Sequence, residues 1–198
     1  MGEVNAGGPL DRRQVVARLL ADRQNLLVVT GLGSASYDVM AAGDHDNNYY
    51  LWAAMGSAAM VGLGLAKAKP DHSVLVVTGD GEMLMGLGAL ATIAVQAPPN
   101  LTIAVLDNGH FGETGMQLSH AGRGIGLERI AGSCGFAWTS EIRDMVQVDA
   151  LRERLGARSG PALATIKITA ADAPRVLPPR DGVFIKNRFR ASLGHAPI

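Results

Sequence analysis

Short apolar runs recur along the chain, and segments with helical character separate them. The runs at residues 26–30, 74–78, 101–106 and 162–168 are almost wholly apolar, which is typical of strands buried on both faces of a parallel sheet. Shorter runs at residues 47–51 and 136–138 predict two more strands. Amphipathic or small-residue segments predict helices at residues 11–22, 35–42, 55–67, 83–95, 127–134 and 144–155. This alternation predicts an α/β fold with a doubly wound, parallel sheet.

The C-terminal end of the chain differs in composition from the rest. Residues 171–198 are rich in Pro and Arg, and we expect them to wrap over a surface as an extension of a domain formed by residues 1–170. A length of 198 residues is that of one domain with a sizeable core. The glycine-rich stretch at residues 109–126 is predicted to be a long functional loop.

Composition and charge exclude several classes of protein. Lys and Arg together number 18, as do Asp and Glu, so neither a nucleic-acid partner nor an anionic membrane surface is indicated. The single cysteine, Cys134, excludes a disulfide framework or a cysteine-ligated cluster within this chain. The first 22 residues lack the apolar core of a signal peptide, and the apolar segment 51–66 is short and rich in small residues. We therefore expect a cytoplasmic protein without a membrane span.

Two of the predicted strands end in residues suited to a metal and a phosphate group. The run at 74–78 leads into Gly79-Asp80-Gly81, and the run at 101–106 leads into Asp107-Asn108-Gly109. Open α/β sheets bind ligands at the carboxyl ends of their strands. Asp80 and Asn108 carry hard oxygen ligands of the kind Mg²⁺ prefers, and the glycines leave room for a diphosphate. The alternative is a pair of ordinary strand-to-helix loops built from turn residues.

This arrangement resembles the metal-diphosphate motif of thiamine diphosphate (ThDP) enzymes, in which a Gly-Asp-Gly is followed by an Asn at the end of the next strand. Residues 48–51, 55–58, 86–93 and 96–101 also resemble segments of this family. Across about residues 10–170 the chain is most similar to sulfopyruvate and phosphonopyruvate decarboxylases, and it resembles the diphosphate-binding (beta) subunit of the former. The resemblance implies a three-layer α/β/α fold around a mostly parallel sheet of six strands.

The resemblance also implies a set of metal ligands. Asp80 and Asn108 would bind Mg²⁺ through side-chain oxygens, and the backbone carbonyl of His110 would be the third protein ligand. Diphosphate oxygens and a water would complete an octahedron. The His110 imidazole is a candidate catalytic group, and the alternative is a solvated loop histidine.

Other residues would contact the organic part of the cofactor or its diphosphate. Met55 corresponds to the bulky apolar residue that supports the thiazolium ring, and backbone groups of Ala53 and Met55 would bind the pyrimidine. The alternative for Met55 is an ordinary core methionine. Gly31, Gly33 and Ser34 are placed to touch the diphosphate, unless they form a plain glycine turn in which Ser34 caps the next helix.

The chain departs from the family pattern after the Gly-Asp-Gly. Many relatives have Ser at the position of Glu82, and a carboxylate there would repel a diphosphate. We therefore expect the Glu82 side chain to point away, leaving the N–H groups of Glu82 and Met83, at a helix N-terminus, to bind phosphate beside Gly79 and Gly81. Asp107 replaces a second Asn of the relatives and is expected to be structural.

The glutamate that activates ThDP in this family belongs to a second, pyrimidine-binding domain, which residues 1–198 do not accommodate. The resemblance thus implies a separate alpha-type partner subunit, self-association without it, and decarboxylation of a small anionic 2-oxoacid. Alternatives are an acetolactate-synthase-like carboligase subunit, a subunit of an oxoacid–ferredoxin oxidoreductase, and a non-catalytic scaffold or regulatory subunit. Candidate cations for a sulfonate or phosphonate are Arg123, Arg129, Arg175, Arg180, Lys186 and Arg188.

Overall fold

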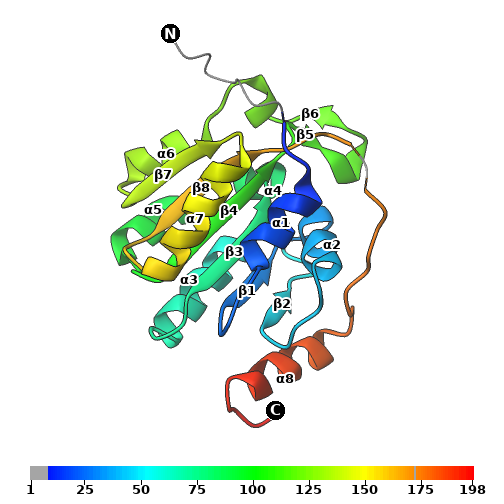
Figure 1. Cartoon of the computed structure of the whole chain (residues 1–198), viewed down its shortest axis with the longest axis vertical. Coiled ribbons are helices and arrows are strands. Elements are labelled where there is room, and N and C mark those ends of the chain that lie inside the picture. Colours follow the sequence, from blue (N-terminus) through cyan, green and yellow to red (C-terminus); the bar gives the residue numbers. More distant parts are fainter. Residues whose placement is uncertain (1–8, 172) are drawn as a thin grey trace.

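The computed structural model describes residues 9–171 and 173–198 and contains one parallel sheet between two layers of helices (Figure 1). The strand order is β2-β1-β3-β4-β8-β7, and every neighbouring pair is parallel. The predicted three-layer fold with six strands is therefore confirmed. The strands are β1 (Leu27–Thr30), β2 (Asn48–Tyr50), β3 (Val74–Gly79), β4 (Leu101–Asp107), β7 (Trp138–Ile142) and β8 (Ala162–Lys167).

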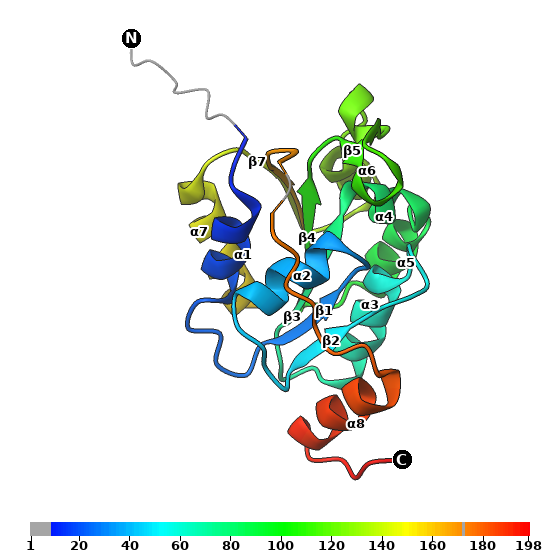
Figure 2. The same cartoon turned by 90° about the vertical axis from the view of Figure 1, so that its right-hand side faces the viewer.

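Each face of the sheet has its own helices and its own core (Figure 2). One face is covered by α1 (Arg12–Leu20), α2 (Ser34–Ala41) and α7 (Met145–Ala157). The other is covered by α3 (Ala58–Ala68), α4 (Asp80–Met85), α5 (Ala89–Gln96) and α6 (Leu127–Cys134). Strand residues alternate between these cores: Val28 and Leu75 pack into the first, and Leu27 and Val76 into the second. Burial on both sides explains the uninterrupted apolar runs of the central strands.

The predicted ligand-binding edge lies where the chain changes direction across the sheet. From β1 the chain passes to the edge strand β2 and then returns to β3, on the other side of β1. The carboxyl ends of β1 and β3 therefore border a topological switch point, where open α/β sheets form a crevice. Above this edge, the predicted long loop contains a small hairpin, β5 (His110–Phe111) and β6 (Gln117–Leu118), and the short 3₁₀ helices η1 (Gly112–Thr114) and η2 (Ala121–Arg123).

Two predicted helices have different bounds because glycines near them are needed for close contacts. The helix expected at 55–67 begins only at Ala58, since Ala54 and Gly56 adopt φ angles of +57° and +88°. The helix expected at 83–95 is two helices separated around Gly86. A Cβ atom at Gly86 would lie 2.0 Å from the carbonyl oxygen of Gly56. Ser34 does not cap α2, because Gly33 is the cap residue and no side chain bonds there.

A strand and a helix in the C-terminal part of the chain differ from the sequence-based prediction. The strand expected at 136–138 runs from Trp138 to Ile142, and its sequence is less apolar than that of the central strands. The tail contains an additional helix, α8 (Gly182–Ser192), capped by the Asp181 carboxylate, which accepts from the N–H groups of Val183 and Phe184 at 2.9 and 3.1 Å. This Asp cap, followed by apolar residues at helical spacing, was a usable signal.

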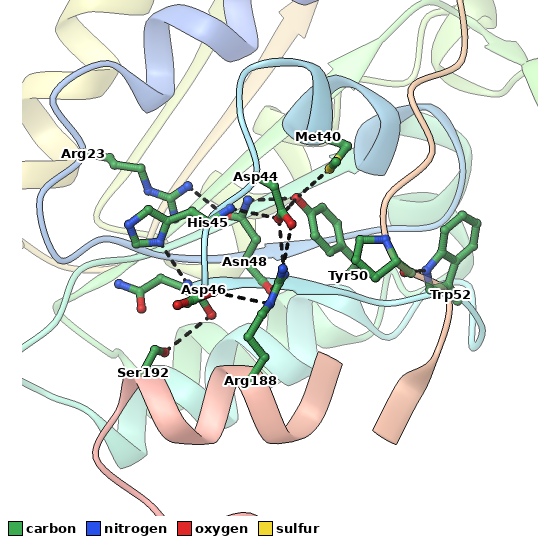
Figure 3. Close-up of polar contacts among 12 residues, drawn as sticks. Arg23, Met40, Asp44, His45, Asp46, Asn48, Tyr50, Trp52, Arg188 and Ser192 are labelled. Atoms are coloured by element: carbon green, nitrogen blue, oxygen red, sulfur yellow. Dashed lines mark hydrogen bonds and ion pairs between the residues drawn. The ribbon is translucent and has the colours of Figure 1, made fainter. Parts of the chain in front are cut away.

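Helix α8 is fixed against the edge strand β2 by Arg188 (Figure 3). The Arg188 guanidinium pairs with Asp44 at 2.6 Å, and the Tyr50 hydroxyl donates to the same carboxylate at 2.9 Å. Upstream of the helix, the Trp52 indole N–H donates to the Pro179 carbonyl at 2.6 Å. The edge strand is thereby covered, which removes a surface that could pair with another chain.

We predict that Arg188→Ala lowers the free energy of unfolding by about 1–2 kcal/mol, because it removes the largely buried Arg188 side chain and its pairing with Asp44. Arg190→Ala is the control, since within residues 9–171 and 173–198 the Arg190 guanidinium donates hydrogen bonds only to the Ala196 carbonyl; its effect should stay within about 0.5 kcal/mol. Urea unfolding measures both variants. Equal stabilities for the two would contradict the assigned role of Arg188.

Candidate functional site

A cavity of about 230 Å³ opens at the carboxyl ends of β1, β3 and β4. The loops after these strands, together with the loop between β2 and α3, supply its walls. Eight residues expected from the sequence to bind cofactor or metal line it: Ser34, Met55, Gly79, Asp80, Gly81, Glu82, Asn108 and His110. The structure thus brings together residues from four separate loops.

Four other expected residues lie beside the cavity without lining it. Gly31 follows β1 and adjoins the Glu82 carboxylate, and Gly33 is the residue before α2. Ala53 is exposed in the loop before α3. The Met83 side chain points into the second core and is 2% exposed. For Met83, a contact with phosphate would therefore have to come from the backbone.

Asp80 is the first residue of α4, and its carboxylate is buried. The Ser119 hydroxyl donates to it, but no Lys, Arg or His side chain of the described residues forms an ion pair with it. Burial, reinforced by the nearby charge of Asp107, raises the pKa of Asp80 to about 6, although the Ser119 hydrogen bond opposes the shift. A buried carboxylate without a cationic partner is the charge that a metal ion would neutralise.

Asn108 and His110 form a compact turn after β4. The Asn108 side-chain oxygen accepts from the His110 N–H at 2.9 Å, and the His110 Nδ1 donates to the Asn108 carbonyl at 2.7 Å. The imidazole is thereby folded back on its own loop at the cavity wall. Asp107 pairs with Lys167 on β8 and accepts from the Gly109 N–H at 2.8 Å, so its carboxylate holds the loop in place.

Glu82 is buried at the base of the loops. Its carboxylate accepts from the Thr78 hydroxyl at 2.9 Å and lies so close to Gly31 that a Cβ there would be 1.5 Å from the Glu82 Oε2. Burial raises the pKa of Glu82, while the Thr78 hydroxyl and the backbone of Gly56 and Leu32 act in the opposite direction. The side chain therefore connects the loops after β1, β2 and β3, which is a positioning role.

Several residues near the site had no clear signal in the sequence. The Phe111 ring lies over Gly81, where a Cβ atom would be 2.7 Å from the ring. The Glu113 carboxylate lies over Gly33, where a Cβ atom would be 2.6 Å from the Glu113 Oε1. Arg12 also lines the cavity, although it belongs to the first helix of the chain. Nothing local distinguishes Arg12 from a solvated helix residue, so only the tertiary structure places it here.

The six basic residues considered for a sulfonate or phosphonate do not converge on the cavity. Arg129 donates to the Gly124 carbonyl at 2.8 Å, Lys186 to the Ile198 carbonyl, and Arg188 is engaged by Asp44. Arg175 borders a neighbouring cavity of about 40 Å³ and lies over the Tyr37 ring. None of the six lines the main cavity.

A larger groove, of about 630 Å³, lies at the opposite, amino-terminal edge of the sheet. Its charged side chains pair with one another: Arg18 with Asp149, and Arg152 with Asp22. The groove contains none of the residues expected from the sequence to bind cofactor or metal, so the smaller cavity at the carboxyl edge is the better candidate site.

Comparison with known protein families agrees with this geometry. Residues 31–164 match the model of the thiamine pyrophosphate enzyme, C-terminal TPP binding domain; thiamine pyrophosphate is another name for ThDP. The matched range contains the loops that form the cavity, apart from Arg12 and Ile168. The chain belongs to the thiamine pyrophosphate enzyme family and contains its C-terminal TPP-binding domain.

Within this family, the chain is similar to decarboxylases of two kinds. It is 33% identical over 180 residues to the sulfopyruvate decarboxylase subunit beta of Methanothermobacter thermautotrophicus, covering 91% of this chain and 94% of that one. It is 37% identical over 195 residues to the phosphonopyruvate decarboxylase of Streptomyces viridochromogenes, covering 94% of this chain but 47% of that one. The chain thus spans about half the length of several curated relatives that it matches.

Solved structures share the fold at lower identity. The benzoylformate decarboxylase of Polynucleobacter necessarius superposes with a TM-score of 0.70 at 17% identity, over 88% of this chain and 36% of that one. The 2-oxoglutarate:ferredoxin oxidoreductase of Magnetococcus marinus gives 0.62 at 19% identity, over 99% of this chain and 80% of that one. At these identities the likeness concerns the fold.

The acidic, histidine and cysteine side chains near the site are dispersed. Within residues 9–171 and 173–198, no three His, Cys, Asp or Glu side chains gather into a metal-binding group. A metal at Asp80 would therefore need amide, carbonyl and ligand oxygens as well, which is the usual way Mg²⁺ is held beside a phosphate. None of the helices in this part of the chain combines the length and the apolar character needed to cross a membrane.

We predict that Asp80→Asn stabilises the chain when metal and cofactor are absent, because it removes the cost of burying a charge. With the folded pKa raised to about 6, the gain at pH 8 should reach up to about 3 kcal/mol. The gain should shrink as the pH falls through 6 and vanish below about pH 3, where Asp80 is protonated in both the folded and the unfolded state. Chemical unfolding in EDTA at several pH values measures it, and a less stable Asn variant at pH 8 would contradict the burial argument.

Proposed function

We propose that this chain binds ThDP together with Mg²⁺ in the cavity at the carboxyl edge of the sheet, as the cofactor-binding part of a 2-oxoacid decarboxylase. The observation that carries the proposal is the buried carboxylate of Asp80 at the end of β3, which pairs with no basic side chain in the described part of the chain and lies in the same cavity as Asn108 at the end of β4. Family membership supports the cofactor, and the geometry supports the metal.

The residues present fit a metal-bound diphosphate. Asp80 and Asn108 offer side-chain oxygens, and the His110 backbone adds a carbonyl at the turn after β4. The closely packed glycines after β1 and β3 allow a ligand to approach the backbone. Met55 lines the cavity from the loop before α3, with 40% of its surface exposed, and is available to support the organic part of the cofactor.

The proposed substrate is a small 2-oxoacid with a second acidic group, as in the names of the sulfopyruvate and phosphonopyruvate decarboxylases. ThDP, when bound, would supply the electron sink for loss of CO₂. The chain's own residues would neutralise the diphosphate, orient the cofactor and restrict water at the reacting end. The His110 ring at the cavity wall is within the site and is our candidate for a proton-handling group.

A separate pyrimidine-binding subunit is proposed to complete the site. A relative of nearly the same length is named as a beta subunit, and the described residues form a single sheet domain. Met55 and Met85 line the cavity and are 40% and 64% exposed. Exposed apolar side chains at the rim of a cavity are typical of a surface that a partner covers. The neighbouring residues 49–52 add little to this exposed surface, because Tyr50 is buried and the C-terminal segment contacts Trp52.

We predict that Asp80→Asn weakens Mg²⁺-dependent ThDP binding by a factor on the order of 100 or more, because the diphosphate loses its charged metal ligand. Asn108→Ala should weaken binding less, since it removes a neutral ligand. Calorimetric titration with ThDP and Mg²⁺ measures both. The stability of the Asn variant serves as the folding control, and unchanged affinity in a folded Asp80→Asn chain would refute the metal assignment.

We predict that the chain alone, with ThDP and Mg²⁺, does not decarboxylate sulfopyruvate or phosphonopyruvate. Activity should appear on adding a partner that carries the pyrimidine-binding fold and its activating glutamate. Release of CO₂ and aldehyde is measured before and after addition. Robust turnover by the lone chain would show that a glutamate of its own, such as Glu82 or Glu113, performs the activation.

A further inference from the structure

Arg12 lies at the cofactor edge of the sheet although it is far from the ThDP motif in sequence. Just before it, the Leu10 N–H donates to the Lys167 carbonyl at 2.9 Å, and the Thr169 N–H donates to the Leu10 carbonyl at the same distance. These bonds attach the start of α1 to the end of β8. The first residue of that helix, Arg12, is thereby held beside the strand ends that form the site.

Arg12 and its neighbour Arg13 share one buried carboxylate. The Arg12 Nε lies 2.7 Å from Asp38, and the Arg13 Nε lies 2.6 Å from the other oxygen of the same group. Asp38 is almost completely buried on α2. Two guanidinium groups against one carboxylate leave a net positive charge at this point, and Asp38 holds both arginines in position.

The two arginines differ in what they face. Arg12 lines the main cavity, whereas Arg13 borders only the small neighbouring one and donates to the Pro174 carbonyl at 2.5 Å. Among the hydrogen bonds of the described residues, Arg12 uses only its Nε. Its terminal nitrogens therefore remain available to a ligand.

The charges around the cavity make Arg12 distinctive. Among the described residues that line it, Arg12 is the only Lys or Arg, while Asp80, Glu82 and Glu113 are acidic. A diphosphate in such surroundings needs more positive charge than one divalent metal supplies.

We propose that Arg12 is a cationic contact of this chain to the diphosphate of the cofactor, positioned by Asp38. The inference rests on the proposed binding of ThDP in this cavity. Its chemistry is that of a charge-assisted hydrogen bond between guanidinium and phosphate oxygen, supplied from outside the Gly-Asp-Gly and Asn108 loops.

The test compares Arg12→Gln with Arg13→Gln, since both changes remove one partner of Asp38 but only the first removes a cation from the cavity. The titrants are ThDP and thiamine monophosphate with Mg²⁺, followed by calorimetry. We expect Arg12→Gln to lower the ThDP affinity by about tenfold or more, with a smaller effect on thiamine monophosphate. Arg13→Gln should stay within about twofold of the wild type for both ligands.

The outcomes separate this inference from the proposed function. If the wild type binds ThDP and Arg12→Gln binds it equally well, the inference is wrong and the proposed function stands. Absence of ThDP binding by the wild type overturns both. Should Arg12→Gln fail to fold, Arg12→Lys retains the charge beside Asp38 but not the planar fork. An intermediate loss of ThDP affinity then supports the inference, and no loss refutes it.

Discussion

The burial of the Asp80 carboxylate without a cation is the constraint from which the rest of the site follows. The fold creates it, because β3 ends in the middle of the sheet and delivers Asp80 into the cavity at the carboxyl ends of β1, β3 and β4. Such a group is costly for the free chain and becomes favourable only when a positive ion is present. The buried carboxylate therefore lowers the stability of the protein without ligand and increases its affinity for a metal-bound anion.

A second buried acid, Glu82, fixes the relative positions of the loops around Asp80. Its carboxylate connects Thr78 with the loop after β1, and Gly31 lets it lie against the backbone there, because a Cβ at Gly31 would displace it. Gly56 and Gly86 make a similar contact between the loops after β2 and α4. Close backbone packing of this kind holds Met55, Asp80 and Asn108 in one cavity, although they come from different parts of the sequence.

Much of this arrangement could be predicted from the sequence, because it depends on local patterns. The buried strands follow from their apolar runs, and the strand-end Asp80 and Asn108 follow from where those runs stop. The contributions of Arg12 and Glu113 could not be predicted, since each depends on a tertiary contact without a local signature. Helix α8 differs from the prediction for another reason: the Pro- and Arg-rich composition indicates an irregular tail, and only the Asp181 cap indicates a helix there. The break between α4 and α5 required knowledge that Gly86 meets Gly56.

The central claim is that the cofactor's metal lies between Asp80 and Asn108. Crystals grown with ThDP and Mn²⁺ in place of Mg²⁺ test it directly, because Mn²⁺ is located by its anomalous scattering. The account predicts a single strong peak within coordination distance of the Asp80 carboxylate, the Asn108 side-chain oxygen and the His110 carbonyl, with diphosphate oxygens completing the shell. Bound ThDP with its metal elsewhere, or with no peak at Asp80, would contradict it.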